Sequence, residues 1–169
     1  MSRAGRRASL GLLAALAACG DPARGEAERA VRAYNDAAIV AYRTREIGPL
    51  REVATEKEWG KVVVLVDLKT SNGVVLESEL SSLEVTSASR PSPDRLEVAT
   101  RERWRYFDRP LRPGRSPGPS FVAEMAMQYL LVREGGRWKV ERVWTLSNEI
   151  LEPKGAAAAG GHGHREPLP

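Results

Sequence analysis

The 169-residue sequence contains one cysteine, Cys19, and two histidines, His162 and His164, which both lie near the C-terminus. A single cysteine excludes an intramolecular disulfide bond. Because no histidine precedes residue 162, the predicted domain lacks the base of a Ser-His catalytic triad. The chain also has no glycine-rich loop of the kind that holds phosphate groups. These absences exclude several common classes of enzyme.

Basic charge is scarcer than the formal net charge of +4 suggests. Arg3, Arg6 and Arg7 lie in the first 18 residues, which contain no acidic residue. Residues 19–169 therefore keep 23 of the 26 basic residues against all 22 acidic residues. A nearly neutral chain is a poor match for the phosphate backbone, and we expect no nucleic-acid partner.

Long apolar runs are absent too. The most apolar stretch, at residues 10–18, has about nine residues, whereas a membrane-spanning helix needs about 20. It follows a basic start and ends in small residues, which is the order of a secretory signal peptide. The ending Leu16-Ala17-Ala18-Cys19 resembles the lipobox of bacterial lipoproteins at every position.

The lipobox resemblance implies that residues 1–18 are removed and that the Cys19 thiol receives a diacylglyceryl group. Two or more acyl chains anchor a protein stably, so the membrane becomes a partner through the lipid on Cys19. We expect a lipid-anchored protein on the periplasmic side of the cell envelope. Gly20 follows the cysteine, whereas the retention signal of enterobacterial lipoproteins has Asp at this position. The absence of this signal slightly favours the outer membrane. Residues 19–25 form a short linker in this interpretation.

Hydrophobic periodicity predicts an α+β fold with two N-terminal helices and about five mostly antiparallel strands. Helical spacing covers residues 23–43, and Pro49 indicates the first turn of a second, shorter helix. Alternation with period two predicts strands over Val62–Leu68, Val74–Ala88, Leu96–Tyr106, Phe121–Leu131 and Trp138–Leu146. A slip in the pattern between Leu80 and Leu83 indicates a bulge. The Ala/Gly-rich residues 152–169 are predicted to be disordered.

The closing run Tyr129-Leu-Leu-Val-Arg-Glu-Gly-Gly-Arg-Trp-Lys-Val-Glu141 resembles the last hairpin of NTF2-like domains. The similarity is strongest to the domains of plastid and cyanobacterial division proteins, and it covers about residues 26–147. It implies an NTF2-like cone over residues 26–151, in which a curved sheet wraps a helix. Such cones often have a cavity at the open end and often form homodimers.

Two charged residues interrupt faces that are otherwise apolar, Glu102 between Thr100 and Trp104, and Arg142 between Val140 and Trp144. Because an unpaired buried charge is costly, one interpretation is that Glu102 and Arg142 form a salt bridge, or that one of them lies at the solvent-exposed end of the sheet. The other is a cavity in which Glu102 acts as a general base and Arg142 holds an anionic ligand. The residues expected to bind ligand in that case are Glu102, Trp104, Tyr129, Arg142 and Trp144.

The leading functional hypothesis is a membrane-anchored, non-enzymatic module that binds an envelope protein or a small apolar ligand. The alternative is an NTF2-like isomerase or dehydratase that uses Glu102 as its acid/base group. Neither hypothesis requires a cofactor. His162 and His164 provide only two metal ligands on a tail, so we expect no metal site.

Overall fold

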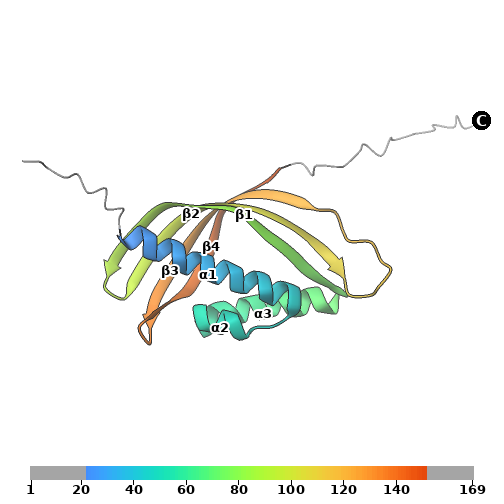
Figure 1. The fold of residues 1–169 in the computed structure, drawn as a ribbon, viewed down its shortest axis with the longest axis horizontal. Helices are drawn as coiled ribbons and strands as arrows, with labels where there is room; N and C mark the ends of the chain where they lie inside the picture. Colours follow the sequence, from blue (N-terminus) through green and yellow to red (C-terminus); the bar gives the residue numbers. More distant parts are fainter. Residues whose placement is uncertain (1–21, 152–169) are drawn as a thin grey trace, which may run out of the picture.

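The computed structural model describes residues 22–151, so Cys19, the leader and the tail lie outside the described residues. Three helices precede four strands: α1 (Pro22–Thr44), α2 (Gly48–Val53), α3 (Glu56–Ser71), β1 (Val74–Ser92), β2 (Arg95–Pro110), β3 (Phe121–Glu134) and β4 (Arg137–Leu151). The strands form one antiparallel sheet in the order β1-β2-β3-β4. The sheet arches over α1, and α2 and α3 lie beneath that helix (Figure 1).

Helix α1 confirms the amphipathic helix predicted from the sequence, and it begins inside the stretch expected as a linker. Its buried residues recur every three or four positions, so they form one face. Most of them are alanines, whose small side chains let the helix axis approach the sheet closely. Ala27 and Ala41 are fully buried near the two ends of this face. The hydrophobic core therefore runs along the whole concave side of the sheet.

The strand predicted over Val62–Leu68 is wrong, because these residues belong to helix α3. Glu58, Val62 and Val66 are buried at i, i+4 spacing, whereas Val64 is 68% exposed and Leu68 57% exposed. A run of β-branched residues fits both the strand period of two and the helical period of 3.6. Only the packing of α3 beneath α1 and the sheet decides between a strand and a helix. The molecule consequently has three helices and four strands rather than two helices and about five strands.

Other local predictions are confirmed. Gly48–Val53 is the short second helix, with Pro49 in its first turn and Leu50 buried. The register of β1 against β2 shifts between Leu80 and Ser82, at the predicted bulge. Gly135 and Gly136 have φ values of 57° and 79° and form the tight turn between β3 and β4.

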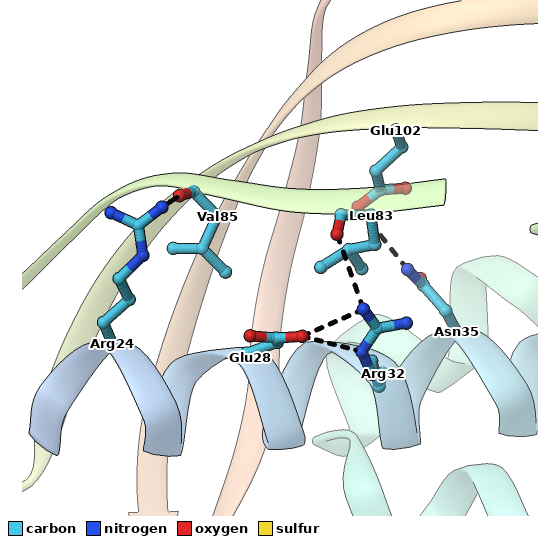
Figure 2. Close-up of polar contacts among 7 residues, drawn as sticks. All are labelled: Arg24, Glu28, Arg32, Asn35, Leu83, Val85 and Glu102. Atoms are coloured by element: carbon cyan, nitrogen blue, oxygen red, sulfur yellow. Dashed lines mark hydrogen bonds and ion pairs between the residues drawn. The ribbon is translucent and has the colours of Figure 1, made fainter. Parts of the chain in front are cut away.

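Helix α1 also covers the free edge of β1. Arg24 donates to the carbonyl oxygen of Val85, and Arg32 donates to that of Leu83 at 3.4 Å, as Figure 2 shows. Glu28 holds the Arg32 guanidinium in place at 2.9 Å. Since unpaired carbonyl groups at a sheet edge invite pairing with other chains, these arginines make the β1 edge less available for such pairing. They also fix α1 against the sheet.

No helix among residues 22–151 is long and apolar enough to span a membrane.

Candidate functional site

A cavity of about 420 Å³ lies between α1, α3 and the concave face of the sheet. Its walls are mainly apolar, with the aliphatic and thioether side chains of Ala38, Val62, Leu65, Leu76, Met125, Met127 and Val143. Its aromatic side chains are Tyr34, Tyr42, Trp104, Tyr106 and Tyr129. Its polar side chains are Asn35, Glu58, Lys61, Ser78 and Glu102. This size and this mixture are typical of a site for a small organic ligand.

Glu102 is the central polar group, and it is only 1% exposed. Its Oε1 accepts hydrogen bonds from the hydroxyls of Thr100 at 2.8 Å and Tyr129 at 2.7 Å, and from Asn35 Nδ2 at 3.4 Å. Its Oε2 accepts one hydrogen bond, from Trp104 Nε1 at 2.7 Å. The carboxylate is thus held by four neutral donors, and Oε2 has room for another.

The donors reach Glu102 from three elements, which fixes the position of its side chain. Thr100, Glu102 and Trp104 alternate along β2 and so point to the same face. Tyr129 lies on the neighbouring strand β3 and points to that face as well. Asn35 projects from α1 toward Glu102, as Figure 2 shows.

A second buried carboxylate, that of Glu58 on α3, also lines the cavity. Its Oε1 accepts a hydrogen bond from the Tyr34 hydroxyl at 3.2 Å, and its Oε2 pairs with Lys61 Nζ at 2.5 Å. Glu58 is not among the residues predicted from the sequence, because it lies next to the segment that was predicted as a strand. Read with a period of 3.6, its spacing from Val62 would have placed it on the inward face.

Three tyrosines are shielded from water around these carboxylates. Burial raises the pKa of Tyr34 well above its ordinary value, and the negative charge of Glu58 raises it further. Burial and the same charge raise the pKa of Tyr42 to about 12. Burial raises the pKa of Tyr129, and the negative charge of Glu102 raises it further. We call Tyr34, Tyr42 and Tyr129 the shielded tyrosines; their hydroxyls remain neutral donors at physiological pH.

Ser78 on β1 also lines the cavity, and its side chain is 8% exposed. Its Oγ has no hydrogen-bond partner among residues 22–151. An unsatisfied buried hydroxyl is uncommon and costs about 1–3 kcal/mol. Because Ser78 lines the cavity, its hydroxyl is available to form a hydrogen bond with a group inside it.

The structure brings together three of the predicted ligand-binding residues, Glu102, Trp104 and Tyr129, in the wall of the cavity. It does not bring Arg142 or Trp144 there. The register of β3 against β4 shifts between Leu130 and Leu131, so Glu141 is an extra residue in β4.

The bulge at Glu141 exchanges the two faces of β4 between Val140 and a second register shift at Leu146. Val143 therefore points into the cavity. Arg142 and Trp144 point to the opposite face, where the Arg142 guanidinium lies 5.2 Å from the centre of the Trp144 ring. Trp144 is 38% exposed there, and Leu146, the extra residue at the second register shift, is 61% exposed. The expected Glu102–Arg142 pair is thus absent.

Ser116 lies in the sequence Gly114-Arg115-Ser116-Pro117-Gly118, which has the spacing of a hydrolase nucleophile elbow. In such enzymes that motif joins a strand to a helix, whereas here it lies in the loop between β2 and β3. Residues 22–151 contain no histidine to activate the serine. The spacing therefore has no catalytic setting in this fold. The same part of the chain holds no group of three or more potential metal ligands.

Comparison with known proteins identifies the fold. No protein-family model and no curated protein matches this chain. Among solved structures, the intermembrane space region of the chloroplast protein ARC6 is similar with a TM-score of 0.66 and 17% identity, over 73% of this chain and 96% of that one. A type 2 hexachlorocyclohexane dehydrochlorinase, LinA, has a TM-score of 0.51 and 11% identity, over 76% and 91% of the two chains.

A third similar structure is the type 3 LinA of Novosphingobium barchaimii LL02, with a TM-score of 0.50 and 12% identity, over 76% of this chain and 92% of that one. One of these proteins is named for the compartment of its region and two for an enzymatic reaction, so the likeness does not transfer an activity. At these identities it shows the fold alone. The described part of this chain therefore has an NTF2-like α+β fold.

Proposed function

We propose that this protein is a membrane-anchored, non-enzymatic binding module that holds a small, largely apolar ligand in the cavity beneath its sheet. The cavity is the observation that carries this proposal. Its walls are mainly apolar, yet a few polar groups face it at fixed positions, and Ser78 Oγ among them has no partner among the described residues. Apolar walls supply affinity and fixed polar groups supply orientation in small-molecule sites.

The hydrogen bonds of Glu102 support binding over catalysis. A general base must be free to take a proton from its substrate. Three of the four donors to Glu102 occupy Oε1, and all four come from rigid helix or strand positions. This arrangement favours a carboxylate that stays in place and orients a ligand.

A cavity-filling substitution tests the binding function. Val143→Phe places a larger side chain in the cavity, whereas Ser147→Phe adds the same ring on the exposed side of the same strand. We expect a fluorescent apolar probe that brightens on leaving water to bind the wild type and Ser147→Phe, and to lose binding in Val143→Phe. Circular dichroism establishes that both variants are folded. Equal binding by the two variants would place the probe outside the cavity and contradict the proposal.

The anchor is a separate part of the proposal, and it is supported by the lipobox at Leu16-Ala17-Ala18-Cys19. We expect the protein to fractionate with bacterial membranes and its N-terminal peptide to carry a diacylglyceryl group and further acylation by mass spectrometry. Cys19→Ala should move the protein to the soluble fraction or leave its leader uncleaved. A wild-type protein that is cleaved elsewhere and carries no lipid would refute the anchor without touching the cavity.

One observation favours the enzymatic alternative, namely that Oε2 of Glu102 accepts a single hydrogen bond and keeps a lone pair for a substrate proton. If Glu102 is an acid/base group, Glu102→Gln should abolish turnover of a substrate and retain its binding. If it orients a ligand, the same substitution should weaken binding, and no turnover should be found in either form.

A further inference from the structure

We propose that the ligand of this cavity is a lipophilic cation, an amine whose ammonium group binds beside Glu102 and whose apolar body fills the remaining space. The inference rests on the proposed binding function and specifies the chemical class of the ligand. It is carried by the charges of the wall, by the aromatic rings around them and by an unsatisfied hydroxyl.

The wall of the cavity has an excess of negative charge. It contains two carboxylates, Glu58 and Glu102, and one ammonium group, that of Lys61. Lys61 pairs with Glu58 at 2.5 Å and is half exposed, so its charge is already matched. Among residues 22–151, no basic side chain forms an ion pair with Glu102, whose four partners are neutral. One carboxylate therefore lacks a positive charge beside it.

A cation in the cavity would supply that missing charge. Neutral donors offset part of the cost of burying a carboxylate, but a positive partner adds a direct attraction between opposite charges, which neutral donors do not supply. Oε1 already accepts three donors and Oε2 accepts only that of Trp104. The ammonium group is therefore expected to bind at Oε2.

The aromatic side chains fit the same ligand. Tyr34 and Tyr129 meet edge to face with their ring centres 6.2 Å apart, and Trp104 is fixed by its bond to Glu102. Aromatic faces attract ammonium groups as well as apolar surface, and cages of such rings are a known means of binding alkylammonium ligands. An anionic ligand would instead be repelled by both carboxylates and by the ring faces.

Ser78 marks the opposite end of the site. It pairs with Tyr106 in the sheet, and Tyr106 lies four residues along β2 from Glu102. Four residues of a strand span about 13 Å. The unpartnered Oγ of Ser78 is thus too far from Glu102 to contact an ammonium group that is bound there. We infer a ligand with an apolar body between the cation and a second polar group that Ser78 can bind.

Three probes with one apolar body and different charges test the inference directly. Phenylbutylamine, phenylbutanol and phenylbutyrate present a cation, a neutral hydroxyl and an anion on the same scaffold. Their dissociation constants for the purified full chain are measured by isothermal titration calorimetry at neutral pH. We expect the amine to bind about tenfold to a hundredfold more tightly than the alcohol, and the carboxylate most weakly.

Two variants assign the preference to Glu102. Glu102→Gln removes the charge and should lower the affinity for the amine to that for the alcohol, while the affinity for the alcohol changes little. Glu79→Gln removes an exposed carboxylate that pairs with Arg105 and does not line the cavity, and should leave both affinities unchanged. The comparison of the three probes in the wild type needs no variant, so it stands even if Glu102→Gln fails to fold.

The outcomes separate this inference from the proposed function. Equal affinities for the amine and the alcohol, or tightest binding of the carboxylate, would overturn the cation and leave a binding cavity in place. An amine preference that Glu79→Gln removes as fully as Glu102→Gln would make it an effect of overall charge and overturn the site. Binding of none of the three probes at about 1 mM would overturn both proposals.

Discussion

Tyr129→Phe tests whether the hydroxyl of Tyr129 holds the buried carboxylate in place. The side chain is 1% exposed, and its hydroxyl donates to Glu102 Oε1 at 2.7 Å. Phenylalanine keeps the ring, so the edge-to-face contact with Tyr34 and the buried apolar area are both retained. The substitution therefore removes the short hydrogen bond to Glu102 and a longer one to Asn35 Oδ1 at 3.3 Å, and little else.

The magnitude follows from the charge of the acceptor. A hydrogen bond to a charged group contributes about 1.5–3 kcal/mol to stability. Thr100 and Asn35 still donate to the same oxygen after the substitution, which places the expected loss in the lower half of that range, at about 1.5–2 kcal/mol. In a Glu102→Gln background the acceptor is neutral, and the loss should fall to about 0.5–1.5 kcal/mol.

The assay is denaturant unfolding of wild type and variants followed by tryptophan fluorescence. Tyr106→Phe is the matched control, because Tyr106 lines the same cavity and stacks on Phe121, but its hydroxyl makes no hydrogen bond among residues 22–151. We expect Tyr106→Phe to change the free energy of unfolding by less than about 0.5 kcal/mol. A change in midpoint with an unchanged slope identifies a true change in stability.

Two results would refute this reasoning. If Tyr129→Phe costs no more than Tyr106→Phe, the hydroxyl does not stabilise the carboxylate. If the cost is the same with Glu and with Gln at position 102, the partner of the hydroxyl is not a charged group.

Three further predictions concern pH and the backbone. The shielded tyrosines stay neutral in the fold above their ordinary pKa of 10 but ionise in the unfolded chain. The free energy of unfolding should therefore be constant below pH 10 and fall above it, by up to about 4 kcal/mol per pH unit if all three tyrosines contribute one proton each. Tyr42→Phe should reduce that slope by about a third, and an unchanged slope would contradict the prediction. Partial burial of Glu77 opposes its charge, but hydrogen bonds and charges from two arginines outweigh this and lower its pKa below 4.5. The contribution of Glu77 to the free energy of unfolding is present above pH 4.5 and is lost as the pH falls through the lower pKa of the folded state. Glu77→Gln should therefore make the free energy of unfolding fall less steeply at acidic pH. An unchanged dependence on acidic pH would contradict the pairing of Glu77 with the two arginines. Gly136 has a φ of 79°, so Gly136→Ala should lower the free energy of unfolding by about 1 kcal/mol in thermal unfolding. Gly60 lies in α3, and nothing lies within 4 Å of the methyl group that alanine would add, so Gly60→Ala should raise the free energy of unfolding by about 0.5–1 kcal/mol. Equal effects of the two substitutions would contradict this reasoning.

Local sequence patterns are sufficient to predict those helices and strands whose hydrophobic spacing fits a single period. The inward face of α1 could be read from the spacing of its alanines, and that of β2 from the alternation that ends in Glu102, Trp104 and Tyr106. The Gly135-Gly136 turn and the bulge after Leu80 were also readable, because glycine pairs and breaks in alternation have local causes.

The remaining features depend on contacts between residues that are far apart in the sequence, so local patterns do not predict them. Val62–Leu68 fits both a strand and a helix, and packing of α3 under the sheet selects the helix. The bulge at Glu141 arises from the pairing of β4 with β3, and one extra residue is enough to turn Arg142 and Trp144 out of the cavity. The same tertiary contacts bring Asn35, Tyr129 and Glu102 together across 94 residues of chain. A periodic pattern can assign a side chain to a face, but the partner on that face is supplied by another element of the fold.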